Sequence, residues 1–377
     1  MTKYSSLQIS LYNLDNAFGV SGDETEVAGV LCKEMEGLYD EHFEDAMGNQ
    51  YFVRYGRDKD RKILFSAHMD EIGFIVNYIE DNGLIRFLPV GYHDDRNAVN
   101  QDMIVMTDSG KKVMGVTGAK PAHIMTAEDH EKVQKIEDLF LDVGTTSREE
   151  TLALGINMGD YIGFAREGYV LNGGKYYTGK AVDDRSACAV MVEVLKRLKG
   201  EDIEPTVVMV GSVQEEVGLR AGVPIMNNID PEVMIALDVT LTGDTPGVPI
   251  EKCSQKMGEG PGVKYYDWDP DRAMGNNVSR KVTRAIIKTA EKHGIPFQRE
   301  VFIGGGTDAW QAPMVGKGYL AGGICIPQRY MHTAVGTIHM DDLENTVRLT
   351  EHFIREYKGL RNRKYQQPKA SFKRRPL

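Results

Sequence analysis

The chain has 377 residues, of which 41% are hydrophobic and 27% charged, as in a globular protein of one large domain or two modest ones. Its formal net charge of −10 argues against a general nucleic-acid-binding protein, which needs an excess of lysine and arginine. The four cysteines contain no Cys-x-x-Cys pair, which excludes a disulfide scaffold and a zinc ribbon. The sequence has no apolar run of roughly 20 residues and no signal-peptide core, so we expect a cytoplasmic protein without a membrane partner.

The first 70 residues alternate between helix and strand patterns. Residues 5–40 predict two helices, which are separated by a Gly-rich turn at residues 18–22. A strand pair is predicted around residues 43–55, and the apolar run at residues 62–70 predicts a further strand that ends in His68 and Asp70. This opening is typical of an α/β domain.

The pattern changes between about residue 71 and residue 175, where long amphipathic helices are scarce and short strands recur. The predicted strands cover residues 73–79, 84–90, 103–107, 112–116, 139–143 and 160–165. Turn sequences at residues 81–83 and 108–110 separate some of them. Their spacing favours a small all-β domain inserted into the α/β chain, and the alternative is a continuation of the same sheet.

The α/β pattern returns after residue 175. Predicted helices cover residues 187–195, 279–293 and 343–357, and predicted strands cover residues 207–211, 233–238 and 323–327. We therefore expect a catalytic domain at residues 1–70 and 175–360, with a β-barrel-like insertion at residues 71–174. Residues 361–377 contain seven basic residues and no acidic one, which predicts a disordered tail.

Polar side chains collect at the predicted strand ends and adjoining loops, which is where α/β sheets bind their ligands. They are His68, Asp70, Asp183, Glu215, Glu216, Asp238 and His332. Taken alone, the adjacent pair Glu215 and Glu216 also fits a solvated turn. Imidazole and carboxylate ligands without thiolate suit Zn, Co, Mn or Fe. Two histidines and three carboxylates are the right number for two metal ions that share a bridging carboxylate.

Five stretches of this chain together resemble the M42 family of dinuclear metallo-aminopeptidases, which includes the TET-type peptidases and the glutamyl aminopeptidases. They are Ser66–Phe74, Gly179–Arg185, Val213–Gly218, Ala236–Val239 and Arg329–His332, in family order. The resemblance implies a mixed α/β sheet domain with an inserted small β-domain that mediates dimerisation. It also implies that dimers assemble into a hollow dodecamer.

The resemblance assigns a role to each residue of the strand ends. Asp183 would bridge the two metals, His68 and Asp238 would complete one site, and Glu216 and His332 the other. Asp70 would hydrogen-bond His68, and Glu215 would act as general base on a water bridged by the metals. The peptide bond from Asp183 to Asp184 would be cis, and Asp184 itself is not expected to be a ligand.

The Gly-rich run at residues 304–308 lacks the spacing and the lysine of a phosphate-binding loop. The resemblance instead places such a loop beside the substrate, so we expect Gly305, Gly306 and Thr307 to line the substrate site. Backbone without side chains allows a close approach of a peptide.

The predicted function is removal of N-terminal residues from short peptides by a metal-dependent aminopeptidase. The predicted cofactors are two divalent ions per subunit, Zn or Co first and Mn as a third option. One alternative is a deacylase or carboxypeptidase on the same dinuclear core. Further alternatives are a cellulase-like glycosidase, which needs only two carboxylates, and a binding scaffold with a structural metal.

Overall fold

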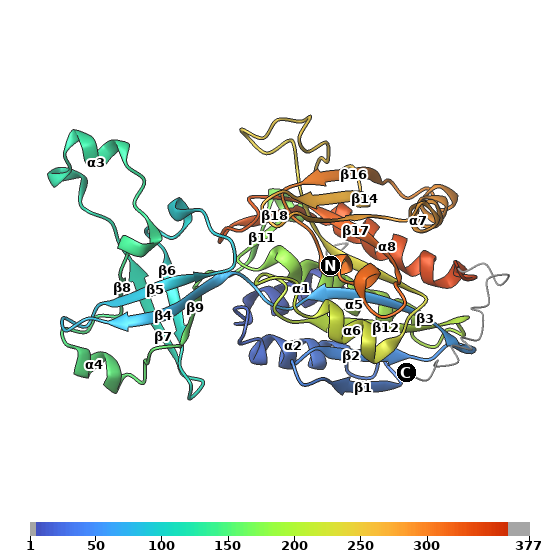
Figure 1. Cartoon of the computed structure of the whole chain (residues 1–377), viewed down its shortest axis with the longest axis horizontal. Coiled ribbons are helices and arrows are strands. Elements are labelled where there is room, and N and C mark those ends of the chain that lie inside the picture. The colour runs from blue at the N-terminus through green and yellow to red at the C-terminus, as the bar shows by residue number, and fades with distance from the viewer. Residues whose placement is uncertain (1–4, 361–377) are drawn as a thin grey trace, which may run out of the picture.

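The computed structural model describes residues 5–360, so the predicted basic tail of residues 361–377 lies outside the described residues. The described chain forms a large α/β unit and a smaller β-barrel that stands to one side of it (Figure 1). Within residues 5–360, no helix has the length and apolar character needed to cross a membrane.

A mixed sheet of twelve strands runs through the α/β unit. Nine strands follow one another in the order β1 (Glu41–Glu44), β2 (Gln50–Arg54), β12 (Pro205–Ser212), β3 (Asp58–His68), β13 (Val233–Leu241), β17 (Leu320–Arg329), β18 (Gly336–His339), β11 (Tyr176–Gly179) and β10 (Tyr169–Leu171). Three further strands join through β17 and are β14 (Gly262–Asp269), β15 (Met274–Asn277) and β16 (Gln298–Ile303).

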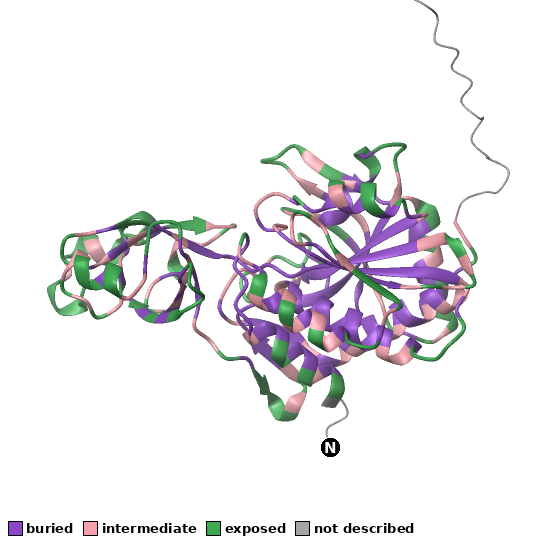
Figure 2. Cartoon of the chain, turned by 90° about the horizontal axis from the view of Figure 1, so that it is seen from below, coloured by how far each residue is buried: buried purple, intermediate pink, exposed green. Residues whose placement is uncertain are grey.

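The four central strands, β12, β3, β13 and β17, run parallel to one another. Parallel strands buried on both faces are nearly continuous apolar runs, and every residue of β12 is indeed buried. Figure 2 shows the strands at the centre of the sheet as largely buried. Because the strands are parallel, their carboxyl ends meet at one edge of the sheet. His68, Ser212, Asp238 and Arg329 therefore all lie at or near that edge.

Helices cover both faces of this sheet, and alternate residues of each strand point to opposite faces. Phe65 belongs to the larger core, whereas its neighbour Leu64 belongs to a smaller one. The larger core contains α1 (Ser5–Asn16), α2 (Thr25–Met35), α5 (Val182–Leu198), α7 (Arg280–Lys292) and α8 (Met340–Glu356). The smaller core contains α6 (Gly222–Ile229).

The barrel is a closed antiparallel sheet with its own aromatic core of Phe74, Phe87 and Phe164. In barrel order its strands are β4 (Gly73–Ile79), β5 (Ile85–Val90), β8 (Leu141–Asp142), β7 (Lys112–Thr117), β6 (Asp102–Met106) and β9 (Tyr161–Phe164). Two short helices, α3 (Ala127–Glu131) and α4 (Arg148–Ala153), lie in its connections (Figure 1). The predicted fold class, a mixed α/β domain with an inserted all-β domain, is confirmed, and the alternative of one continuous sheet is wrong.

Several strands of the main sheet were not predicted. Strands β14 and β16 carry the charged residues Lys264, Asp267 and Glu300, all buried, so they lack the apolar pattern of the central strands. Strand β10 pairs with β11 of the main sheet, so the last barrel strand by pairing is β9.

Candidate metal centre

Asp70 ties the ends of β3 and β12 together. The two oxygens of its carboxylate accept hydrogen bonds from the backbone N–H groups of Glu215 and Glu216, each at 3.1 Å. Strand β12 ends at Ser212, and Gln214, just before the glutamates, has a positive φ of 57°. The Glu pair is therefore held in a turn at the strand end by a buried carboxylate.

His68, the last residue of β3, is only 3% exposed and is oriented through both ring nitrogens. Its Nδ1 lies 3.1 Å from the main-chain oxygen of Asp70 and 3.6 Å from Oδ1 of the same residue. Its Nε2 lies 3.1 Å from Oδ1 of Asp183. A proton on Nδ1 directed at Asp70 leaves Nε2 free to bind a metal, which is the usual arrangement of a ligating histidine.

Asp183 lies between two imidazoles that come from distant parts of the chain. Its Oδ1 faces His68, and its Oδ2 lies 3.5 Å from Nε2 of His332. The same Nε2 lies 3.4 Å from Oε2 of Glu216. The peptide bond between Asp183 and Asp184 is cis, as expected.

His332 stands in a turn after β17, with a positive φ of 56°. Its Nδ1 lies 2.8 Å from the main-chain oxygen of Tyr92, a residue of the segment that returns from β5. Because a carbonyl only accepts, Nδ1 carries the proton and Nε2 is left for Asp183 and Glu216. The orientation of this candidate ligand is therefore set by a residue far away in sequence.

Two groups of side chains could each hold a cation, because the ligand atoms within each group lie within 4.8 Å of one another. One group is His68, Asp183 and Glu216, and the other is His68, Asp184 and Asp238. Asp184, which sequence reasoning set aside, is fully buried and accepts a hydrogen bond at 3.3 Å from the backbone N–H of His68. Its position beside Asp183 was the one signal for its place in the centre.

The centre has a large excess of buried negative charge. Burial raises the pKa of Asp238 to about 8 and that of Glu216 to about 7. Burial, followed by the charge of Asp238, raises the pKa of Asp184 well above its ordinary value, and Oδ1 of Asp184 has no hydrogen-bond partner. Within residues 5–360, no lysine or arginine forms a salt bridge with these carboxylates. Divalent cations fit this donor set, because they would compensate charge that is otherwise buried unpaired.

Glu215 is partly exposed and belongs to neither group of candidate ligands. Burial of its carboxylate and the charges of Glu216, Asp238 and Asp308 raise the pKa of Glu215 well above its ordinary value, although His68 opposes them. Asp308 was missed by sequence reasoning. It is 3% exposed, and its Oδ1 has no hydrogen-bond partner.

Asp308 also locates the Gly-rich loop relative to the centre. The loop of residues 304–307 follows β16 and leads directly into Asp308. Thr307 is buried, and its hydroxyl accepts a hydrogen bond from the backbone N–H of Ala309 at 3.3 Å. Gly306 lies against the indole of Trp310, where an added Cβ would come within 1.8 Å of a ring atom. Gly305 is half-buried, with Phe302 as its neighbour.

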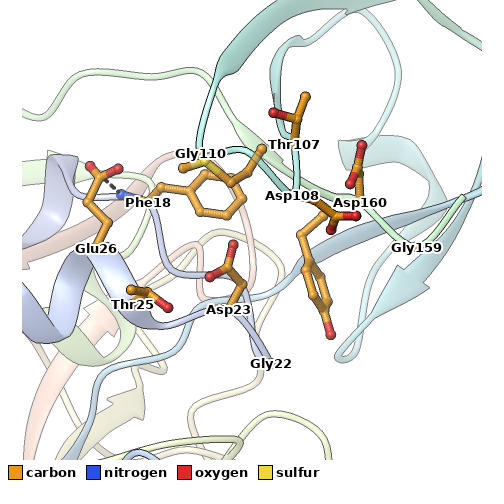
Figure 3. Close-up of a pocket in the computed structure, with 12 residues that line it drawn as sticks. Phe18, Gly22, Asp23, Thr25, Glu26, Thr107, Asp108, Gly110, Gly159 and Asp160 are labelled. Atoms are coloured by element: carbon orange, nitrogen blue, oxygen red, sulfur yellow. Dashed lines mark hydrogen bonds between the residues drawn. The ribbon is translucent and has the colours of Figure 1, made fainter. Parts of the chain in front are cut away.

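A cavity of about 430 Å³ lies away from these residues, at the junction of the α/β unit with the barrel (Figure 3). Its lining includes the carboxylates of Asp23, Glu26, Asp108 and Asp160, and the ring of Phe18. Glu26 accepts a hydrogen bond from the backbone N–H of Phe18 at 3.2 Å, and it pairs with Lys112 of the barrel at 2.7 Å. None of the candidate metal ligands lines this cavity.

Comparison with known proteins identifies the family. The family model of the M42 glutamyl aminopeptidases matches residues 48–349. The chain belongs to the M42 family. It is therefore an aminopeptidase, a hydrolase of that family. The M42 match spans the candidate metal ligands and the barrel together.

Solved structures of aminopeptidases, two of them of TET type, share the fold over nearly the whole chain. The TET aminopeptidase of a marine-sediment Thaumarchaeota archaeon has a TM-score of 0.88 and 33% identity, covering 94% of this chain and 97% of that one. An aminopeptidase of Desulfurococcus kamchatkensis has a TM-score of 0.87 and 36% identity, covering 94% and 95%. The TET1 peptidase of Pyrococcus horikoshii, which can assemble into a tetrahedron or a large octahedral shell, has a TM-score of 0.82 and 32% identity, covering 93% and 100%.

Two curated relatives are aminopeptidases whose names refer to different amino acids. The lysyl aminopeptidase of Pyrococcus furiosus is 31% identical over 91% of this chain and 95% of its own length. The glutamyl aminopeptidase of Lactococcus lactis is 28% identical over 85% of this chain and 88% of its own length. These two relatives are named for side chains of opposite charge.

Proposed function

We propose that the chain is a two-metal aminopeptidase that removes N-terminal residues from short peptides. The observation that carries this proposal is the position of Asp183. Its two carboxylate oxygens face the imidazoles of His68 and His332 at 3.1 and 3.5 Å, as a ligand shared by two cations requires. Glu216 and Asp238 supply the remaining oxygens, one on each side.

The donor set defines the class of metal. Imidazole nitrogen with carboxylate oxygen suits Zn or Co, and Mn is a third option. Cations held there polarise a peptide carbonyl and lower the pKa of water toward neutrality. His68, Asp183 and Asp238 hold one ion, and Asp183, Glu216 and His332 hold the other. Asp184, which has a carboxylate oxygen within 4.8 Å of the ligand atoms of His68 and Asp238, is an additional donor for the first ion.

Glu215 is the general base of the reaction. Glu215 is not one of the proposed metal ligands. The turn held by Asp70 brings it beside the two candidate ion sites. It takes a proton from the attacking water and returns that proton to the amine of the leaving peptide. Its raised pKa suits a group that must accept and then release a proton near neutral pH.

The decisive experiment is hydrolysis of the p-nitroanilides of Leu, Glu, Lys and Asp by metal-stripped protein refilled with Zn or Co. The comparison variant is Glu215→Gln, and Glu204→Gln at the other end of β12 is its matched control. We expect metal-dependent activity that falls about 10²–10⁴-fold in Glu215→Gln, while the control keeps wild-type activity. The panel also measures the side-chain preference, because the relatives are named for opposite charges.

Three outcomes would contradict the proposal. Wild-type activity in Glu215→Gln would exclude this residue as the base. Two bound metals without hydrolysis of any anilide would favour the deacylase or carboxypeptidase alternative, which N-acyl amino acids would then test. A β-glucan hydrolysis that survives metal removal would favour the glycosidase.

The barrel is a dimerisation domain in this proposal. Its outer face carries exposed apolar side chains on β7, with Met114 57% and Val116 48% exposed. Ile104 of β6 is the strand neighbour of Met114. Dimers joined through the barrel would build the dodecamer that TET relatives form.

A further inference from the structure

Glu71 stands where the chain leaves the α/β unit for the barrel, two residues before β4 begins. It is 1% exposed, although it is a carboxylate. Its backbone N–H donates to the main-chain oxygen of Gly19 at 2.9 Å, and its own carbonyl accepts from Ser21 at 3.0 Å. The entry point of the barrel is thus fixed on the loop between α1 and α2.

Two buried basic side chains contact the carboxylate of Glu71, and in the sequence they lie on either side of Asp183. Lys180 Nζ donates to Oε1 of Glu71 at 2.5 Å, and Arg185 Nη2 lies 3.5 Å from the same oxygen. Lys180 precedes Asp183 in the chain by three residues, and Arg185 follows it by two. We call Glu71, Lys180 and Arg185 the buried clamp.

The clamp is also hydrogen-bonded to the backbone at the end of α1. Lys180 also donates to the carbonyl of Ala17 at 2.9 Å, and Arg185 donates to that of Leu14 at 2.7 Å. The backbone N–H of Ala181 donates to Oδ1 of Asp15 at 2.7 Å. Each of these contacts holds the segment that carries Asp183 against the end of α1.

We propose that Glu71 is a positioning residue for the metal centre, acting on Asp183 through Lys180 and Arg185. This inference rests on the proposed function, which assigns Asp183 as the ligand shared by two ions. The clamp fixes the segment on both sides of Asp183, so that its two oxygens point at His68 and His332. The barrel segment therefore completes the metal centre in addition to any role in assembly.

A separate contact at the end of the β4–β5 hairpin supports the same inference. Tyr92, just after β5, holds Nδ1 of His332 with its main-chain oxygen at 2.8 Å. A Cβ added to Gly91 would meet Ile72 at 2.7 Å and the Cβ of Glu216 at 3.6 Å. Segments at both ends of the first barrel hairpin thus contact residues that carry candidate ligands.

The test measures metal binding and kinetics of full-length variants. Glu71→Gln leaves buried Lys180 without its ion pair and is expected to lower thermal stability. The double variant Glu71→Gln/Lys180→Met removes the charges of Glu71 and Lys180 and leaves Arg185 with its carbonyl partners Leu14 and Ala17, so it is expected to recover part of that stability. Arg197→Met, in the last turn of the same helix α5, removes a salt bridge to Glu344 at 2.8 Å and serves as the matched control.

We expect the double variant to bind Zn²⁺ 10–100-fold more weakly than wild type in a chelator competition. We also expect its kcat to fall by a larger factor than the factor by which its KM changes. The control should melt lower yet keep wild-type Zn²⁺ affinity and kcat. Wild-type Zn²⁺ affinity and kcat in the double variant would overturn the inference. A wild-type protein that binds no Zn²⁺ would instead overturn the proposed function, so the two failures are distinguishable.

Discussion

At the scale of single residues, the centre depends on side chains that orient other side chains. Asp70 contacts His68 and accepts the backbone N–H groups of Glu215 and Glu216, so one carboxylate positions a candidate ligand and the candidate base together. The main-chain oxygen of Tyr92 does the same for His332. Such contacts leave Nε2 of each histidine available for a metal.

Asp70→Asn should weaken metal binding and lower kcat by about 10–100-fold each. An asparagine has one acceptor oxygen in place of two, so one of the two N–H groups would face an NH₂ group in a buried place. Metal affinity and steady-state kinetics measure the effect. Asp58→Asn is the control, because Asp58 accepts two backbone N–H groups at the other end of β3. Equal losses in both variants would contradict this prediction.

At the scale of elements, loops held by buried side chains shape the region around the centre. The Gly-rich loop of residues 304–307 packs on Trp310, whose indole N–H donates to Asp267 of β14. A similar contact lies at the start of helix α8. There the carboxylate of Asp342 accepts hydrogen bonds from the backbone N–H groups of Gly258 at 2.6 Å and Gly260 at 2.7 Å. In both places a loop keeps its shape because one buried polar group anchors it.

Gly306→Ala should destabilise the protein by about 1–3 kcal/mol, because the new methyl group must displace the Trp310 ring. The measurement is thermal unfolding, together with KM for the best anilide substrate. Gly305→Ala is the matched control, since its Cβ would come no nearer than 3.2 Å to the edge of Phe302. Similar melting temperatures for the two variants would show that the Trp310 contact does not constrain the loop.

Asp342 should make stability depend on pH. Burial raises the pKa of Asp342 from 3.8 to about 6. The folded state therefore keeps a proton that the unfolded state loses, so the stabilising contribution is complete below pH 4 and is lost as the pH rises through about 6. The loss amounts to at most about 3 kcal/mol, at 1.36 kcal/mol per pKa unit.

Asp342→Asn has no such titration at this site. The melting temperatures of metal-free wild type and variant are measured from pH 4 to pH 7 with a chelator present. As the pH rises, the melting temperature of wild type should fall relative to that of the variant, so that the two plots against pH converge or cross. Curves that stay parallel over this range would exclude a raised pKa at Asp342.

At the scale of the whole molecule, the barrel is both an outer body and a neighbour of the centre. It is joined to the α/β unit by the buried contacts of Glu71 and by the surface pair of Lys112 and Glu26. Strand β7 presents Met114 and Val116 to solvent, as a surface that pairs with another copy does.

Met114→Asp with Val116→Asp should reduce the assembly to smaller species, because the charges would be buried in the proposed barrel interface. Light scattering after size-exclusion chromatography measures the mass. Lys111→Asp, on the turn before β7, is the control for added charge. An unchanged mass in the double variant would exclude this face as the dimer contact.

Much of the scaffold of this protein could be predicted from its residues. Apolar runs predicted the parallel strands. The position of His68, Glu215, Glu216 and Asp238 at or just after the ends of those strands made them candidate site residues. The recurring strand-type segments of the barrel placed a strand at residues 73–79, which is β4 in the structure. These features were predictable because burial leaves a local pattern in the chain.

Which groups contact one another could be seen only in the folded chain. Asp183 lies between His68 and His332 because the parallel strands pair side by side and because the clamp at Glu71 holds its segment. Strands β14 and β16 escaped prediction because their buried Lys264, Asp267 and Glu300 satisfy one another instead of following an apolar pattern. Asp184 and Asp308 escaped prediction because no local sequence pattern shows that these carboxylates are buried beside the other acidic groups of the centre. Long-range electrostatic pairing therefore set the site, whereas local hydrophobic pattern set the scaffold.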